Sequence, residues 1–174
     1  MKHLALSEFS PKDFDLFKSW IDSNELLITI AGKNLIFPLT NEQLEIYLND
    51  PKSDSFNVID INENKIIGHA EIIHTELNKC KLDKIIIGDK TQRGKGIGAE
   101  LINLLLEHAF NMIGMEEVML YVYDWNIAGI KCYEKAGFKI QENNSLQTKF
   151  DNKIWTALQM TISKEQWKIK ANTL

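Results

Sequence analysis

The chain has 174 residues and a mass of 20.0 kDa, a length that suits one domain with a sizeable apolar core. Apolar residues make up 44% and charged residues 25%, as in ordinary globular proteins, and the net charge of -4 argues against bulk binding to nucleic acid. The two cysteines, with no CxxC or His/Cys cluster, predict neither a disulfide framework nor a metal site.

Targeting and membrane signals are also missing from the sequence. A membrane span needs roughly 20 apolar residues in a row, and no stretch approaches that length. Segment 1–10 has too short an apolar run for a secretory signal. We therefore expect a single domain over residues 1–174 that is cytoplasmic and binds neither a membrane nor nucleic acid.

The first half of the chain predicts a strand, two helices and then three strands. Ser10 followed by Pro11 marks a helix start, and Thr40 with Gln43 three residues on forms a capping-box pattern. The turn sequence at 62–64 separates two strand patterns and predicts a hairpin. The predicted elements are a strand at 2–9, helices at 10–21 and 40–48, and strands at 55–61, 65–76 and 80–88.

The second half predicts alternating helices and strands. The strand at 80–88, the helix at 96–113 and the strand at 117–124 form a strand–helix–strand unit, whose two strands should be parallel and joined by a right-handed crossover. Ser163 and Gln166 form another capping-box pattern. Antiparallel strands first and a parallel unit second imply a mixed sheet in an α/β or α+β layer fold. The predicted elements are helices at 96–113, 126–136 and 163–169, and strands at 117–124, 138–143 and 153–162.

A basic, glycine-rich loop separates the strand at 80–88 from the helix that follows. The start of a helix has about four backbone N–H groups without a partner and a partial positive charge. Glycines let such a backbone approach a ligand closely, and here Gly94, Gly96 and Gly98 alternate with cations at Lys90, Arg93 and Lys95. The pattern predicts a seat for a phosphate or pyrophosphate, against the plainer interpretation of a solvated turn.

Three phosphate-binding patterns compete for this loop. A P-loop fails, because Gly88 is one residue too far from Gly94 and Gly96 stands where Ser or Thr belongs. A GxGxxA dinucleotide fingerprint matches Gly94, Gly96 and Ala99, but it comes too late in the chain for two nucleotide-binding halves. The pattern [RQ]xxGx[GA] fits directly, with Arg93, Gly96 and Gly98, after a strand and at the start of a helix.

A second constellation lies at 121–138, in the sequence YVYDWNIAGIKCYEKAGF. On a helix, Asn126 and Tyr133 share one face, because seven residues make about two turns. Structural roles are also open to them: Asn126 as a helix N-cap, Tyr133 as a packed aromatic and Gly137 as a C-cap. We expect the C-cap at Gly137 in either case.

Together the two motifs resemble those of the GNAT superfamily of acetyl-CoA-dependent N-acetyltransferases. The weaker outer segments resemble the branch near the ribosomal-protein N-terminal (alanine) acetyltransferases. The resemblance implies a mixed, mostly antiparallel central sheet with a splayed parallel strand pair, flanked by helices. It also implies acetyl-CoA as cosubstrate and direct transfer of the acetyl group to a primary amine, on a protein N-terminus or a small molecule.

By the same resemblance, most site residues would bind the cofactor. Backbone groups on the last strand before the loop would pair with the pantetheine arm and supply an oxyanion donor, and the loop would hold the pyrophosphate. Asn126 would hold the pantetheine, Lys131 or Lys135 would reach the 3′-phosphate, and Tyr133 would be the general acid that protonates the leaving sulfur. The strand and loop residues are Ile85, Ile86, Ile87, Gln92, Arg93, Gly94, Lys95, Gly96, Ile97 and Gly98.

The general base has three candidates, Glu71, His69 and Asp83. Glu71 and His69 differ by two and so share a strand face, and Glu71 is our choice, acting through a water. Cys132 is an alternative covalent nucleophile. A catalytically silent acyl-CoA-binding or sensor module on the same fold is the alternative function, and the sequence does not identify the amine.

Overall fold

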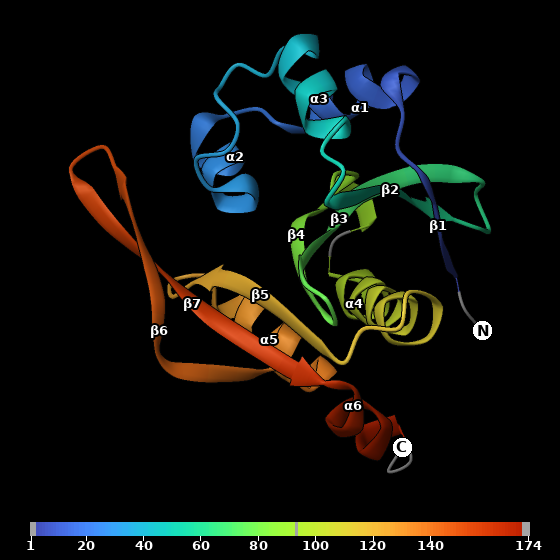
Figure 1. Cartoon of the computed structure of the whole chain (residues 1–174). Coiled ribbons are helices and arrows are strands. Elements are labelled where there is room, and N and C mark those ends of the chain that lie inside the picture. Colours follow the sequence, from blue (N-terminus) through green and yellow to red (C-terminus); the bar gives the residue numbers. More distant parts are fainter. Residues whose placement is uncertain (1–2, 93, 172–174) are drawn as a thin grey trace. The chain divides into compact units, whose positions relative to one another are not determined.

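The computed structural model describes residues 3–92 and 94–171 (Figure 1). Arg93 therefore lies outside the described residues. Seven strands form one sheet in the order β1-β2-β3-β4-β5-β7-β6. The strands are β1 (Leu4–Glu8), β2 (Ser53–Asp60), β3 (Lys65–Glu76), β4 (Lys79–Ile87), β5 (Glu117–Tyr123), β6 (Lys139–Phe150) and β7 (Lys153–Ser163).

The sheet is mixed, as the sequence predicts. β4 pairs with β5 in parallel, with the recorded pairs running from Lys79–Glu117 to Lys81–Met119. The pairs β1–β2, β2–β3, β5–β7 and β6–β7 are antiparallel. The helices are α1 (Phe14–Trp20), α2 (Asn24–Ala31), α3 (Asn41–Leu48), α4 (Ile97–Glu107), α5 (Ile127–Ala136) and α6 (Lys164–Ala171). The predicted mixed α/β fold class is confirmed.

The chain divides into two compact units that interleave along the sequence. The N-terminal unit holds the described residues up to Ile73 together with Asp83–Ile97, and the C-terminal unit holds His74–Leu82 and the chain from Gly98 onward. The strands β3 and β4 each contribute residues to both units.

An aromatic core organises the N-terminal unit. Its helices α1, α2 and α3 lie together over the strands of this unit (Figure 1). Buried apolar side chains from these helices and from the segment after β1 form one cluster, in which the Phe9 ring lies 5.7 Å from that of Phe17. Leu27 of α2 and Leu44 of α3 are fully buried in the same cluster. Burial of each such side chain contributes about 1.5–3 kcal/mol.

The N-terminal helix starts match the capping patterns, with one difference. At a short 3-10 turn, Pro11–Asp13, the Asp13 carboxylate accepts hydrogen bonds from the backbone N–H and the hydroxyl of Ser10. The Thr40 side chain accepts a hydrogen bond from the Gln43 backbone N–H, as expected. The Gln43 side chain, however, bonds the backbone N–H and C=O of Ile36 instead of completing the box. The expected capping box at Thr40 is therefore only half formed.

The C-terminal unit contains α4 from Gly98 onward, α5 and the strands β5, β6 and β7. Gly137 adopts a left-handed φ of 108° and ends α5, which confirms the predicted C-cap. Ser163 and Gln166 exchange the two hydrogen bonds of the predicted capping box at α6. The helix predicted at 96–113 stops at Glu107 and continues as a π-turn, His108–Met112.

Candidate active site

The glycine-rich loop enters α4 through two left-handed residues. Gly94 has φ 78° and Gly96 has φ 84°, values that favour glycine because other side chains are strained there. Both glycines are exposed, and a Cβ added at either would meet no atom within 4 Å. The loop therefore uses glycine for its backbone conformation and leaves open space beside it. α4 begins directly afterwards, at Ile97.

Hydrogen bonds and ion pairs to Asp89 and Asp22 hold the segment just before this loop. The Asp89 carboxylate accepts hydrogen bonds from the backbone N–H and the hydroxyl of Thr91 and pairs with Lys65 Nζ at 2.5 Å. These donors hold the pKa of Asp89 well below its usual range. Lys90 pairs with Asp22 at 3.2 Å, and Lys95 Nζ lies 3.4 Å from Gln92 Oε1.

β4 ends at Ile87, shortly before the glycine-rich loop. Ile86 is buried in the aromatic core, whereas Ile85 and Ile87 are partly exposed, as in an alternating strand. A Cβ on Gly88 would overlap the Trp20 indole, so only glycine fits where the strand ends.

In the C-terminal unit, α5 and its N-cap carry the second group of predicted site residues. Asn126 is the N-cap of α5, and its side-chain oxygen accepts the Gly129 N–H at 3.0 Å, so the capping role open to it from sequence is present. Tyr133 is half-buried, with its ring 6.1 Å from that of Phe138. Lys131 is exposed.

The start of α4 and the middle of α5 lie side by side. A Cβ added at Gly98 would stand 3.7 Å from Cys132 Sγ, so the residue that precedes Tyr133 touches the first turn of α4. Burial raises the pKa of the Cys132 thiol. A raised pKa lowers the thiolate fraction at neutral pH, which disfavours Cys132 as a covalent nucleophile.

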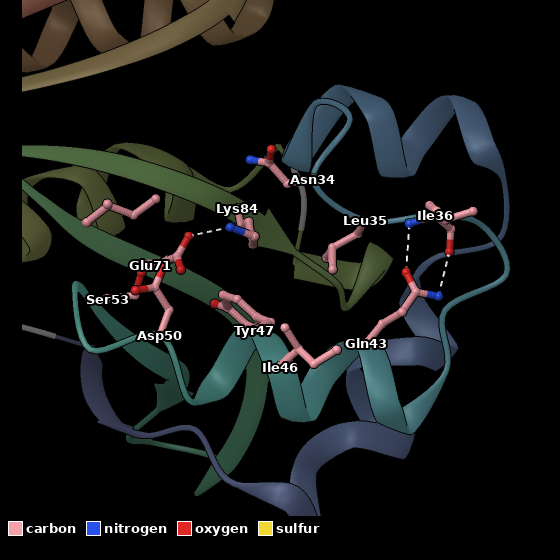
Figure 2. Close-up of a pocket in the computed structure, with 11 residues that line it drawn as sticks. Asn34, Leu35, Ile36, Gln43, Ile46, Tyr47, Asp50, Ser53, Glu71 and Lys84 are labelled. Carbon is pink, nitrogen blue, oxygen red and sulfur yellow. Dashed lines mark hydrogen bonds and ion pairs between the residues drawn. The ribbon is translucent and has the colours of Figure 1, made fainter.

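A cavity of about 460 Å³ opens in the N-terminal unit. It has a polar end, where Asp50, Ser53 and Glu71 lie together, and an apolar end at Leu35 and Ile36 (Figure 2). Its volume falls within the roughly 300–1,000 Å³ that is usual for small-molecule sites. The full lining is Asn34, Leu35, Ile36, Gln43, Ile46, Tyr47, Asp50, Ser53, Glu71, Ile73 and Lys84.

Lys84 also lines the cavity, and the sequence alone did not predict it as a site residue. Its Nζ lies 2.5 Å from Glu71 Oε2 and 3.5 Å from Asp83 Oδ2, and it stands 4.6 Å from the centroid of the Tyr47 ring. The side chains of Lys84 and Glu71 are only 4% and 1% exposed. Lys84 has φ 45°, a left-handed conformation inside a strand that costs a non-glycine residue about 1–3 kcal/mol.

The buried ion pair sets the electrostatics of the cavity. Burial raises the pKa of Glu71, while the Lys84 ammonium and the Ser53 hydroxyl act in the opposite direction. Burial and the nearby Glu71 charge raise the pKa of Tyr47 well above its usual value, so its phenol stays neutral at pH 7. The cavity thus contains a compensated carboxylate and a neutral phenol, with the exposed Asp50 beside them.

The other two candidate bases are placed differently. His69 is fully buried between the rings of Phe9 and Phe17, and Tyr47 Oη lies 2.8 Å from its Nε2. Burial lowers the pKa of His69 to about 3, so the imidazole is neutral at pH 7. Neither His69 nor Asp83 lines the cavity, whereas Glu71 does. Of the three candidates, the structure brings only Glu71 to this space.

The residues described contain no helix long and apolar enough to cross a membrane. Over the same residues, no group of three or more His, Cys, Asp or Glu side chains is placed to hold a metal ion.

Comparison with known proteins identifies the family. A family model described as Acetyltransferase (GNAT) family matches residues 14–138. The chain therefore belongs to the GNAT family and is an N-acetyltransferase by class.

Relatives in sequence are distant. An N-acetyltransferase 9-like protein of Nematostella vectensis is 22% identical over 96% of this chain and 92% of its own length. A prophage-derived N-acetyltransferase of Bacillus subtilis is 26% identical over 79% of this chain and 76% of its own length. The predicted branch near the ribosomal-protein acetyltransferases stays a prediction.

Solved structures share the fold. A spermidine N-acetyltransferase from Vibrio cholerae, in complex with CoA and spermine, has a TM-score of 0.82 at 20% identity and covers 97% of this chain and 99% of its own. An aminoglycoside acetyltransferase in complex with coenzyme A has a TM-score of 0.76 at 19% identity, over 97% of this chain and 99% of its own.

Proposed function

We propose that this protein moves an acetyl group from acetyl-CoA directly to the primary amine of a small molecule. The observation that carries the proposal is the loop at Gly94 and Gly96, whose two left-handed glycines lead into the N-terminus of α4. Such a helix start favours a pyrophosphate. The solved relatives bound to CoA support the same cosubstrate. A cavity of about 460 Å³ favours a small acceptor over a protein N-terminus.

We assign cofactor binding to two segments. The loop at Gln92, Arg93, Gly94, Lys95 and 96–98 would hold the pyrophosphate, with Lys95 adding a full charge. The end of β4, at 85–87, would pair with the pantetheine arm and offer a backbone N–H to the developing oxyanion.

We assign the remaining roles to α5 and its N-cap. Asn126 already uses its side-chain oxygen as a cap, so its amide N–H₂ would serve the pantetheine. Lys131, being exposed, would reach the 3′-phosphate. Tyr133 would give its hydroxyl proton to the sulfur as the carbon–sulfur bond breaks, so that coenzyme A leaves as a thiol.

Glu71 would accept the proton of the attacking amine through a water. It lines the cavity, and its pairing with Lys84 favours the ionised form that a base requires. Glu71 then passes its proton to solvent and Tyr133 regains one from it, so the transfer balances as amine plus thioester giving amide plus thiol.

The same ion pair favours a second candidate, a silent acyl-CoA-binding module, because Lys84 already occupies the carboxylate of Glu71. One experiment separates the two. Thermal melts with acetyl-CoA report binding, and release of free thiol with a panel of amines reports transfer. The transferase predicts both signals. Stabilisation without thiol release for any amine supports the silent module, and the absence of both signals rejects both functions.

A further inference from the structure

The Glu71 carboxylate at the polar end of the cavity is already paired with a side chain of the protein itself. Lys84 Nζ is within 3.5 Å of two carboxylates, those of Glu71 and Asp83, and it stands over the Tyr47 ring. Its three N–H donors therefore face two anions and a π surface. The Glu71 carboxylate, which would otherwise attract a cationic ligand, faces an ammonium group from its own chain.

From this arrangement we propose that Lys84 is a specificity residue, which makes the cavity select amines with a single positive charge and an apolar body against diamines and polyamines. The inference rests on the proposed function, since it takes the cavity as the acceptor site. It assigns the acceptor class from the charges that line the cavity.

The apolar end of the cavity gives the second part of the argument. Leu35 and Ile36 line that end together with the Gln43 side chain, and neither labelled carboxylate, Asp50 or Glu71, lies there (Figure 2). A second ammonium group there would find no carboxylate to pair with, because the carboxylates among the lining residues, Asp50 and Glu71, lie at the polar end. At the polar end it would meet the Lys84 ammonium instead, and like charges repel. An alkyl body, in contrast, buries favourably against these side chains.

The remaining charged lining residue does not change this balance. Asp50 is exposed at the polar end, and one of its carboxylate oxygens accepts the Lys52 backbone N–H at 3.0 Å. With Lys84 offsetting Glu71, Asp50 leaves one uncompensated carboxylate among the lining residues. That matches an acceptor with one cationic group.

The test uses two probes that differ only in the second amine, hexylamine and 1,6-diaminohexane. Their affinities for the whole protein are measured by calorimetry at pH 7 without acetyl-CoA, so that the result does not depend on turnover. Wild-type protein should bind hexylamine about tenfold more tightly than the diamine, as expected for one unfavourable charge contact in a partly desolvated site. Lys84→Met should remove or reverse this preference, because the Glu71 carboxylate becomes open to the second ammonium group.

Three further variants keep the result interpretable. Lys84→Arg retains the charge and should retain the preference. Glu71→Gln leaves Lys84 without its main partner and should increase discrimination against the diamine. This variant tests the inference even if the Lys84→Met protein does not fold. Lys12→Met removes an exposed lysine outside the cavity and is the matched control, with an unchanged preference.

Equal or tighter binding of the diamine by wild type, binding of neither amine, or a preference that survives in Lys84→Met would each overturn the inference. Thiol release with other amines, despite any of these results, would leave the proposed transferase standing. Loss of all acetyl transfer alongside the expected amine preference would reject the transferase and retain the charge selectivity of the cavity.

Discussion

Lowering the pH should destabilise this protein through one buried imidazole, that of His69. The side chain is fully buried, Nε2 lies within hydrogen-bond distance of the Tyr47 hydroxyl, and Nδ1 has no hydrogen-bond partner among the described residues. Protonation would place a cation between the rings of Phe9 and Phe17, with the Lys84 charge nearby. Burial, followed by Lys84, accordingly lowers the pKa of His69 from 6.5 to about 3.

The sign and size of the effect follow from this pKa. The folded state binds fewer protons than the unfolded state between pH 6.5 and about 3, so the free energy of unfolding falls as the pH falls through that window. Each pH unit within it removes about 1.4 kcal/mol. Between pH 6.5 and 4.5 the contribution of His69 is therefore roughly 3 kcal/mol, and the full window amounts to about 5 kcal/mol.

Urea unfolding followed by tryptophan fluorescence measures this contribution directly. The comparison is between wild type and His69→Gln, since Gln keeps a hydrogen-bonding group near Tyr47 but does not titrate. Between pH 7.5 and 4.5 the wild type should lose about 3 kcal/mol more than the variant, because all other titrating groups are common to both. Parallel pH profiles, within about 0.5 kcal/mol, would refute the argument from burial.

Three further predictions concern the proposed chemistry. Gly96→Ala should weaken acetyl-CoA binding about tenfold in calorimetry, because alanine is strained at φ 84°. Gly114→Ala is the control, since Gly114 has φ 76° and equally open surroundings, and it should leave the affinity unchanged. An equal loss of affinity in both variants would contradict a special role for the loop. Tyr133→Phe should lower kcat by about 10²–10⁴-fold with little change in the KM for acetyl-CoA, and unchanged turnover in a thiol-release assay would return Tyr133 to a packing role. Cys132→Ala should keep turnover within about threefold, because a thiol with a raised pKa is a poor nucleophile at neutral pH; complete inactivation of a folded variant would instead indicate a covalent route.

Local signals account for the parts of the fold that the sequence predicts well. The hairpin of β2 and β3 follows from a three-residue turn between two strand patterns, and the boundaries of α5 follow from Asn126 and Gly137. The glycine loop is equally local, because left-handed φ values restrict the residue type at Gly94 and Gly96. In each case the determining interaction lies within a few residues along the chain.

The elements that the sequence does not predict depend on contacts with residues far away along the chain. The strand predicted at 138–143 extends to Phe150, because β7 pairs with its polar second half from Ser145 onward. No separate helix is predicted at α2, whose interior is rich in Ile and Thr and which packs on the aromatic core.

The candidate site shows the same limit. Sequence spacing places Glu71 on a strand face, but it does not reveal that Lys84, thirteen residues on, turns its ammonium group onto that carboxylate. A lysine in an alternating strand is most simply interpreted as solvent-exposed. Only the tertiary pairing of Lys84 with Glu71, at a left-handed position of β4, shows that it lines the cavity.

The most direct test of the account is a calorimetric comparison of coenzyme A with pantetheine, which lacks the pyrophosphate and the 3′-phosphoadenosine attached to it. If the loop at Gly94 and Gly96 and the start of α4 hold the pyrophosphate, coenzyme A should bind with one site per chain and at least a hundredfold more tightly than pantetheine. Equal affinities for the two compounds, or no heat from coenzyme A, would contradict the proposed cofactor site.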